Sequence, residues 1–244
     1  MRRMNERTEA TIPVFDRWLG SWRIRVHRRA YAGEDLRRMY DRYASWWDAH
    51  LAFLGYPGCY ETLLRAALER IEPPPHRARP RVLDCGVGTG ALSLAMARAS
   101  GGAVELHGVD LSERMLARAR DRLHRAGARA VLRQADVRAL PYESDLFDCV
   151  MASHVLEHLS DPLPALREMA RVLRPGGLLV ACITRRSLGG LFVQLRWRTH
   201  RATSATAQEW LRQSGLGEVT ALELPRGQPC GWFSLACAGR KGAP

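Results

Sequence analysis

Short apolar runs alternate with amphipathic stretches over the last two thirds of the chain. The apolar runs predict β-strands over 81–85, 104–110, 130–135, 146–152, 178–183, 218–224 and 232–238. Helical spacing of apolar positions predicts helices over 91–99, 112–125, 162–173 and 205–214. Apolar strands that alternate with helices are typical of a parallel sheet covered on both faces. We therefore predict an α/β fold: a doubly wound, mainly parallel, seven-stranded sheet with helices on both faces.

The part of the chain before this pattern is organised differently. Helical spacing recurs over 34–50 and 60–71, so we interpret residues 1–72 as an N-terminal helical extension or lid. Residues 73–80 are proline-rich and unsuited to a helix interior, which makes them a linker to a domain over 81–244. Residues 17–29 hold five arginines and no acid, interleaved with Trp18 and Trp22. This stretch is either a basic amphipathic segment for peripheral membrane or anionic contact, or a solvated face.

Composition narrows the class of protein. No apolar run among the 244 residues approaches the roughly 18–20 that a membrane-spanning helix needs. Arg2 and Arg3 are not followed by an apolar stretch of the kind a signal peptide requires, so we expect a cytoplasmic protein. Six cysteines without a C-x-x-C pair, and no histidines near them at ligand spacing, predict reduced core thiols and no metal site.

The charge balance is strongly basic. The chain has 37 lysine and arginine residues, all but one of them arginine, against 25 acidic residues, for a net charge of +12. One interpretation is an ordinary surface on which arginine replaces lysine. The other is a field that attracts an anion: nucleic acid, acidic lipid or an anionic substrate.

The segment Val82–Ala91 reads strand, glycine loop, helix, and carries the candidate chemistry. Glycines there let the backbone turn sharply and let a ligand approach the start of the helix. The spacing G-x-G-x-x-A also fits a dinucleotide site. The acids at three strand ends favour a ligand other than a dinucleotide. Asp84 would repel a pyrophosphate and attract an ammonium. Asp110 can accept bonds from ribose hydroxyls, and Asp136 from the exocyclic amine of adenine.

These three acids together suit a ligand that has an amino-acid head, a ribose and an adenine. Over about residues 81–184 the chain resembles the class I S-adenosylmethionine (SAM)-dependent methyltransferases, which have a Rossmann-like fold. The matching motifs are Val82–Gly90, Gly108–Ser112 with Met115, Gln134–Val137, Phe147–Val150, His154–Leu159 and Leu173–Gly177. Residues 39–48 resemble the lead-in helix of the ubiquinone and menaquinone methyltransferase subgroup, although Trp47 stands where that pattern has a second tyrosine.

The resemblance implies SAM as cofactor and assigns residues to it. Its methionine end would lie against Asp84 and the glycines Gly86, Gly88 and Gly90, and its ribose against Asp110. Its adenine would lie against Asp136 and Val137, with Leu111 and Met115 packed on its face. Ser153 would complete the site, where the loop after the fourth predicted strand faces the sulfonium. Tyr40 and Tyr43 in the lead-in helix are either lid or core residues.

The reacting groups are less determined by the sequence. Methyl transfer is an in-line displacement that needs alignment above all, and a general base only where the acceptor holds a proton. His154 is the candidate base, because an imidazole titrates near neutral pH; the alternative is that it orients the cofactor or caps a turn. We interpret residues 185–204 as a substrate-side insertion, and Arg196 and Trp197 within it are candidate acceptor contacts. From 169 to 208 there are seven arginines and no acid, suited to an anionic aromatic acceptor or to a solvated face.

We therefore predict a SAM-dependent methyltransferase that acts on a small-molecule acceptor by O-, N- or C-methylation. An anionic or aromatic acceptor is the candidate. The alternatives are an RNA or other nucleic-acid methyltransferase, which the net charge favours, and a non-catalytic SAM-binding scaffold. A nicotinamide oxidoreductase is disfavoured by Asp84. The sequence does not determine the acceptor or the oligomeric state.

Overall fold

The computed structural model describes residues 11–29, 35, 37–39, 41–42, 49, 51–72, 77–188, 191, 194, 199, 201–225 and 227–242. Its strands are β1 (Thr11–Leu19), β2 (Trp22–Arg29), β3 (Arg81–Cys85), β4 (Glu105–Asp110), β5 (Ala130–Gln134), β6 (Phe147–Ser153), β7 (Leu173–Thr184), β8 (Leu216–Leu222) and β9 (Ser234–Lys241). Its helices are α2 (Tyr56–Leu68), α3 (Ala91–Ala99), α4 (Glu113–Arg125), the 3-10 turn η1 (Leu156–His158), α5 (Leu163–Val172), α7 (Ser204–Gln213) and α8 (Cys230–Phe233). Among these residues no helix is long and apolar enough to cross a membrane.

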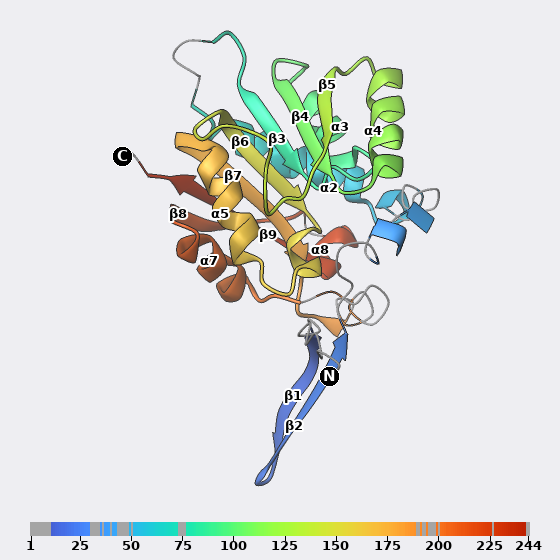
Figure 1. The fold of residues 1–244 in the computed structure, drawn as a ribbon, viewed down its shortest axis with the longest axis vertical. Helices are drawn as coiled ribbons and strands as arrows, with labels where there is room; N and C mark the ends of the chain where they lie inside the picture. The colour runs from blue at the N-terminus through green and yellow to red at the C-terminus, as the bar shows by residue number, and fades with distance from the viewer. Residues whose placement is uncertain are drawn as a thin grey trace, which may run out of the picture.

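Seven strands form one twisted sheet in the order β5-β4-β3-β6-β7-β9-β8 (Figure 1). All neighbours pair in parallel except β9, which is antiparallel to both β7 and β8. The chain winds outward in one direction from β3 and in the other from β6, which confirms the predicted doubly wound architecture. In such sheets ligands bind beyond the carboxyl ends of the strands where the winding reverses, here between β3 and β6.

Two apolar cores sandwich the sheet, because successive strand residues point to opposite faces. In β6, Val150 belongs to the core beneath α5 and α7, whereas Met151 belongs to the core beneath α2 and α3. Leu64 of α2 is fully buried in that second core. Helix α2 therefore covers the sheet directly, although it precedes the proline-rich segment.

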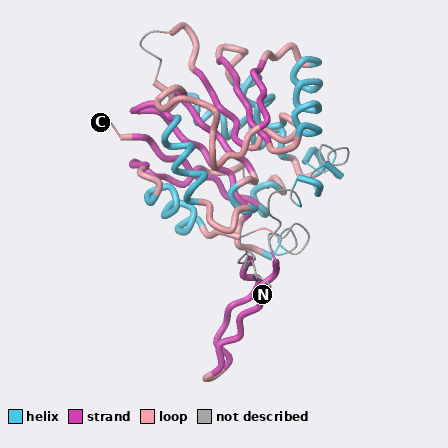
Figure 2. Tube along the Cα trace, viewed as in Figure 1, coloured by secondary structure: helices cyan, strands magenta, loops and turns pink. Residues whose placement is uncertain are grey.

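The N-terminal extension is only partly helical. Residues 11–29 form a two-stranded antiparallel hairpin, β1–β2, in place of the helical structure that we predicted for 1–72 (Figure 2). The hairpin turns at Gly20, whose φ of 61° suits a tight reversal. Ile24 and Val26 alternate with arginines at a period of two, which is the period of a strand. The density of arginine obscured that alternation in the sequence.

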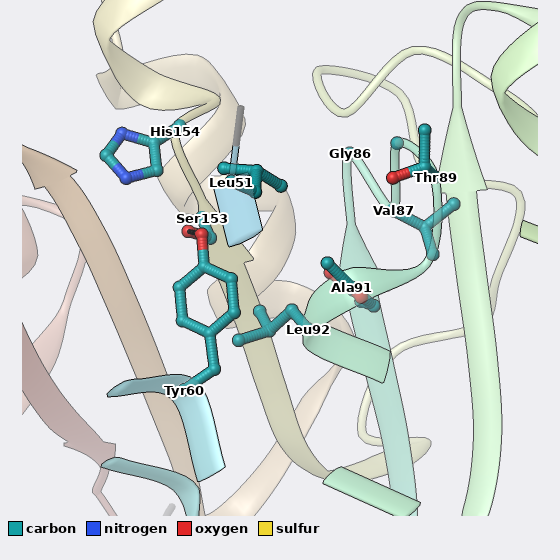
Figure 3. A pocket seen from close by; sticks show the side chains of 11 residues that line it. Leu51, Tyr60, Gly86, Val87, Thr89, Ala91, Leu92, Ser153 and His154 are labelled. Carbon is teal, nitrogen blue, oxygen red and sulfur yellow. Dashed lines mark hydrogen bonds between the residues drawn. The ribbon is translucent and has the colours of Figure 1, made fainter. Parts of the chain in front are cut away.

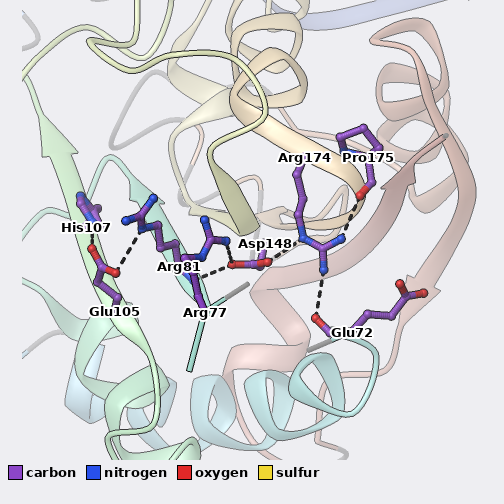
Figure 4. Close-up of polar contacts among 8 residues, drawn as sticks. All are labelled: Glu72, Arg77, Arg81, Glu105, His107, Asp148, Arg174 and Pro175. Atoms are coloured by element: carbon purple, nitrogen blue, oxygen red, sulfur yellow. Dashed lines mark hydrogen bonds and ion pairs between the residues drawn. The ribbon is translucent and has the colours of Figure 1, made fainter. Parts of the chain in front are cut away.

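A buried ion cluster fixes the amino ends of the central strands (Figure 4). Asp148 of β6 is fully buried and accepts hydrogen bonds from Arg174 Nε (2.6 Å), Arg77 Nη2 (2.6 Å) and the Arg81 backbone N–H (2.7 Å). Arg174 also donates to the Glu72 carbonyl at 3.0 Å, just beyond α2. Asp148 thus joins three parts of the chain. Of the proline-rich linker, residues 73–76 lie outside the described residues, and Arg77 is its anchored end.

We expect Asp148→Asn to destabilise the fold by about 3 kcal/mol, because breaking a buried ion cluster leaves charges without their partner. The new amide would have a single acceptor oxygen, and its NH₂ group would face the N–H donors of Arg77, Arg81 or Arg174. A loss of that size lowers Tm by about 6–12 °C in a protein of this length, measurable by calorimetry. Glu105→Gln is the matched control, because Glu105 pairs with Arg81 at an exposed site and such pairs contribute about 0–1 kcal/mol. Equal losses in the two variants would contradict this account.

Candidate functional site

The glycine loop after β3 has the backbone that the sequence predicts. Gly86, Gly88 and Gly90 all have positive φ, at 73°, 52° and 81°. A Cβ on Gly86 would lie 2.3 Å from Val155 Cγ2, so the loop after β6 leaves no room for a side chain there. A Cβ on Gly90 would lie 3.2 Å from Ala119 of α4. Gly86 therefore lets the loop after β6 pack against the glycine loop, and Gly90 lets α3 and α4 approach each other. A Cβ on Gly88 would meet nothing closer than the Gly86 carbonyl oxygen at 3.9 Å.

Asp84 lies at the end of β3, 1% exposed, and lines the pocket. Its Oδ2 accepts a hydrogen bond from Ser93 Oγ at 2.7 Å. Burial, and to a lesser extent the neighbouring charge of Asp110, raises the pKa of Asp84 to about 7. A carboxyl that titrates near neutral pH inside a pocket would gain from a cationic ligand group.

Asp110 connects the loop to α4. Its Oδ2 accepts from the Gly88 backbone N–H and its Oδ1 from the Ser112 backbone N–H, both at 2.9 Å. Burial raises the pKa of Asp110 despite these bonds. Ser112 caps α4 through the Met115 N–H at 3.1 Å and donates its hydroxyl to Asp41 Oδ1. The lead-in segment thus contacts the loop edge through Asp41.

The predicted adenine residues follow the ends of β4 and β5. The Ala135 N–H donates to the Asp110 carbonyl at 3.1 Å, which holds these two strand ends together. Asp136 accepts from the Arg138 guanidinium, and those bonds lower its pKa, so it remains an anion. Val137 and Met115 are buried, and Leu111 is half-buried. These residues lie outside the pocket lining.

One pocket lies beyond the carboxyl ends of β3 and β6 (Figure 3). It brings together five of the predicted residues, from the glycine loop and from the end of β6: Asp84, Gly86, Gly88, Ser153 and His154. Leu51, Tyr60, Val87, Thr89, Ala91 and Leu92 complete its lining. The predicted acceptor contacts Tyr40, Tyr43, Arg196 and Trp197 lie outside the described residues.

His154 has an unusual backbone and a dense polar environment. Its φ is 56°, uncommon for a residue with a side chain and characteristic of sites where function holds the backbone. Nδ1 lies 2.8 Å from Glu157 Oε1, and Nε2 lies 3.2 Å from Ser234 Oγ. The Tyr56 hydroxyl lies 2.6 Å from Ser234 Oγ, so Glu157, His154, Ser234 and Tyr56 form one continuous chain of polar groups.

Glu157 fixes the imidazole and is itself fixed. Its Oε1 also accepts from the Thr184 N–H at 3.0 Å and the Thr184 hydroxyl at 2.6 Å. Among the described residues none offers a hydrogen bond to Glu157 Oε2. Burial favours the neutral acid, but the charge and hydrogen bond of His154 lower the pKa of Glu157 to about 2. Burial likewise opposes a charged imidazole, but Tyr56 and Glu157 raise the pKa of His154 well above 6.5.

The sequence analysis missed the partners of His154. Tyr56 and Tyr60 project from α2, and Tyr60 OH lies 2.7 Å from Ser153 Oγ. Ser234 begins β9, eighty residues after His154. The one available pointer is the tyrosine pair of Tyr56-Pro57-Gly58-Cys59-Tyr60, whose spacing places both rings on one helix face.

Four arginines of the basic stretch 169–208 have structural partners, and one of them is Arg185, whose Nε donates to the Ser234 carbonyl at 3.0 Å. Arg171 pairs with Glu168 and Arg174 with Asp148, near the amino ends of the strands and away from the pocket. Arg201 donates to Gln194 Oε1 at 2.7 Å. Any acceptor contact from this stretch therefore falls to its other arginines.

Comparison with known proteins agrees with this geometry. Residues 83–181 match the family model of a methyltransferase domain. The chain is 42% identical over 107 residues to the 27-O-demethylrifamycin SV methyltransferase of Amycolatopsis mediterranei, covering 43% of this chain and 39% of that one. It is 33% identical over 156 residues to a demethylmenaquinone methyltransferase of Staphylococcus aureus, covering 60% and 64%. The chain thus spans less than two thirds of each of these relatives.

Solved structures share the fold at lower identity. A SAM-dependent methyltransferase of Thermotoga maritima, described as a possible histamine N-methyltransferase, superposes with a TM-score of 0.63 at 20% identity, over 84% of this chain and 99% of that one. The [4+2]-cyclase SpnF superposes with a TM-score of 0.64 at 20% identity, over 88% and 98%. One fold therefore carries differently named activities.

A doubly wound sheet with a glycine loop and acidic strand ends defines a Rossmann-like nucleoside-binding protein. The domain match makes this more specific: residues 83–181 carry a methyltransferase domain, and the chain is similar over part of its length to menaquinone and ubiquinone methyltransferases.

Proposed function

We propose that this chain is an active SAM-dependent methyltransferase with a small-molecule acceptor. The observation that carries the proposal is the pairing, across one pocket, of a buried carboxyl at the glycine loop with a histidine held by a buried glutamate. The first suits the amino-acid head of SAM. The second suits removal of a proton from an acceptor.

The chain's own residues would hold the cofactor from three sides. Asp84 would pair with the SAM ammonium, and Gly86 and Gly88, which line the pocket, would lie against the methionine part. Asp110 would accept from the ribose hydroxyls, and Asp136 from the adenine amine. When bound, SAM supplies a methyl group on a positively charged sulfur. The cradle fits it because Asp84, buried and poised near pH 7, gains a cationic partner.

We infer that His154 takes the acceptor's proton at Nε2. Glu157 holds Nδ1–H, and Nε2, which lies 3.2 Å from Ser234 Oγ, is the nitrogen that would accept the proton when the imidazole is neutral. Glu157 also stabilises the imidazolium that forms, and the Ser234 and Tyr56 hydroxyls reorient around it. His154 lines the same pocket, so its pKa would fall beside the positive charge of bound SAM, which would favour the neutral, proton-accepting imidazole.

The acceptor is a molecule with a removable proton, such as a hydroxyl or a carbon acid. The two relatives are named for demethylrifamycin and demethylmenaquinone, which supports a small-molecule acceptor here. Arg196 and Trp197 remain our candidates for an anionic or aromatic part of it.

Isothermal titration tests the cofactor assignment directly. We expect SAM and its demethylated product S-adenosylhomocysteine to bind, and NAD to bind far more weakly, because Asp84 repels a pyrophosphate. Tighter binding of NAD than of either sulfur compound would overturn the assignment. Mass spectrometry with methyl-labelled SAM and candidate small molecules then tests turnover; binding without any labelled product would favour a SAM-binding scaffold.

A further inference from the structure

The hairpin β1–β2 presents an apolar face to solvent. Trp22, Ile24 and Val26 share one face of β2, and Leu19 lies opposite Trp22 across the turn. The exposed fractions of Leu19 and Trp22 are 70% and 76%, and those of Ile24 and Val26 are 43% and 48%. Figure 1 shows the hairpin extending away from the sheet and its helices at one end of the molecule. The described part of the fold does not cover this face.

The same hairpin is strongly basic. Trp18, on the other face and 65% exposed, has the Arg23 guanidinium 5.7 Å from its ring centroid. Arg25 follows Arg23 on that face of β2. The hairpin holds five arginines against one acid, Asp16, which lies opposite Arg25 in the strand register. A partner that covers the hairpin must therefore offer both an apolar layer and negatively charged groups.

The geometry points to a lipid surface: the β1–β2 hairpin inserts its tip, Trp18 to Trp22, into the headgroup region of an anionic phospholipid bilayer. Indole rings favour that region because they are amphipathic, and arginines beside them pair with lipid phosphates. Leu19 at the tip would reach deepest, towards the boundary of the acyl chains, and Ile24 and Val26, farther from the tip, would face the headgroup region.

Other occupants fit less well. A second copy would bring two arginine-rich ribbons together, at an electrostatic cost. A nucleic acid would satisfy the arginines and stack on the indoles, but it offers no apolar layer for Leu19, Ile24 and Val26. The bilayer meets both requirements, and it needs no change in the sheet domain.

Co-sedimentation of the full chain with vesicles tests the proposal. We expect binding to phosphatidylcholine vesicles that contain about 30 mole per cent of the anionic lipid phosphatidylglycerol. Binding to vesicles of pure phosphatidylcholine should be weak. Added salt should weaken it. Trp18→Ser with Trp22→Ser should reduce the partition coefficient by about tenfold or more, because apolar area is lost. Arg23→Gln with Arg25→Gln should reduce it about 25-fold, at about fivefold per arginine.

Matched controls lie elsewhere on the surface. Phe53→Ser removes an aromatic ring that is 84% exposed, and Arg114→Gln with Arg118→Gln removes two charges from α4. Neither should change vesicle binding, and SAM affinity should be the same in all variants, which shows that each folds. Three results would overturn the proposal: no binding to the anionic vesicles; equal losses in hairpin and control variants; or a dimer or RNA complex, without vesicle binding, that the hairpin variants abolish.

Discussion

Replacing His154 by Asn should lower kcat for methyl transfer by about 10²- to 10⁴-fold, the range that a positioned general base contributes. Asparagine tolerates the positive φ of this position, and its amide N–H can keep the bond to Glu157. The variant therefore removes the proton acceptor but retains the backbone. Tm should fall, because Glu157 loses its buried cationic partner, but single-turnover kinetics with saturating SAM well below the Tm of the variant isolates the chemical step.

The pH profile separates proton transfer from a merely structural role. As a base, His154 acts when neutral, so kcat should rise with pH through the pKa of His154 in the SAM complex. Glu157→Gln should move the midpoint of that rise to lower pH, because it removes the anion that raises the pKa. The change is nearly isosteric: the oxygen can keep Thr184, and the new NH₂ replaces the Oε2 that lacks a described partner.

An unchanged kcat in His154→Asn would contradict the base role and favour an acceptor already ionised before it binds. An unshifted pH midpoint in Glu157→Gln, with wild-type SAM affinity, would assign the pH dependence to another group. Asp148→Asn is a useful reference for these experiments, because it should cost stability without moving the pH midpoint.

The parts of the site that the sequence predicted share one property: they are local. The glycine loop, Asp84 and Asp110 act within a strand end and the turn that follows it, so strand periodicity and residue type were enough to place them. The doubly wound sheet followed in the same way, from runs of buried residues and the helices between them.

The missing parts depend on contacts across the chain. Ser234 reaches His154 only because β9 pairs antiparallel with β7, and Tyr56 reaches it only because α2 packs against the sheet. Neither contact leaves a local pattern. Asp148 looked like an ordinary residue of a motif, and its role follows from three arginines that the fold brings to it.

Asp84→Asn should weaken binding of S-adenosylhomocysteine about 10- to 150-fold, because a hydrogen-bonded charge is worth about 1.5–3 kcal/mol. The product is the better probe: it keeps the ammonium but lacks the positive sulfur, so His154 does not respond to it electrostatically. Wild-type affinity should rise with pH until about pH 7, where Asp84 ionises, and then level off. In Asp84→Asn this dependence should vanish.

Titration calorimetry in buffers of different ionisation enthalpy checks the same group by counting protons. The wild type should release close to one proton per ligand at pH 6 and almost none at pH 8, and Asp84→Asn should release none at either pH. An unchanged wild-type release in the variant would show that another group pairs with the ammonium.

Stability should move in the opposite direction from affinity. The folded-state pKa of Asp84 lies above its ordinary value of 3.8, so this carboxyl costs stability increasingly as pH rises from about 4 to about 7. Asp84→Asn removes that cost while its amide oxygen can still accept from Ser93. The variant should therefore unfold at the same temperature as the wild type or higher at pH 8. Asp84 therefore costs stability when no ligand is bound, and it binds the ligand only when it is charged. We infer that this buried acid is retained for ligand binding rather than for the fold.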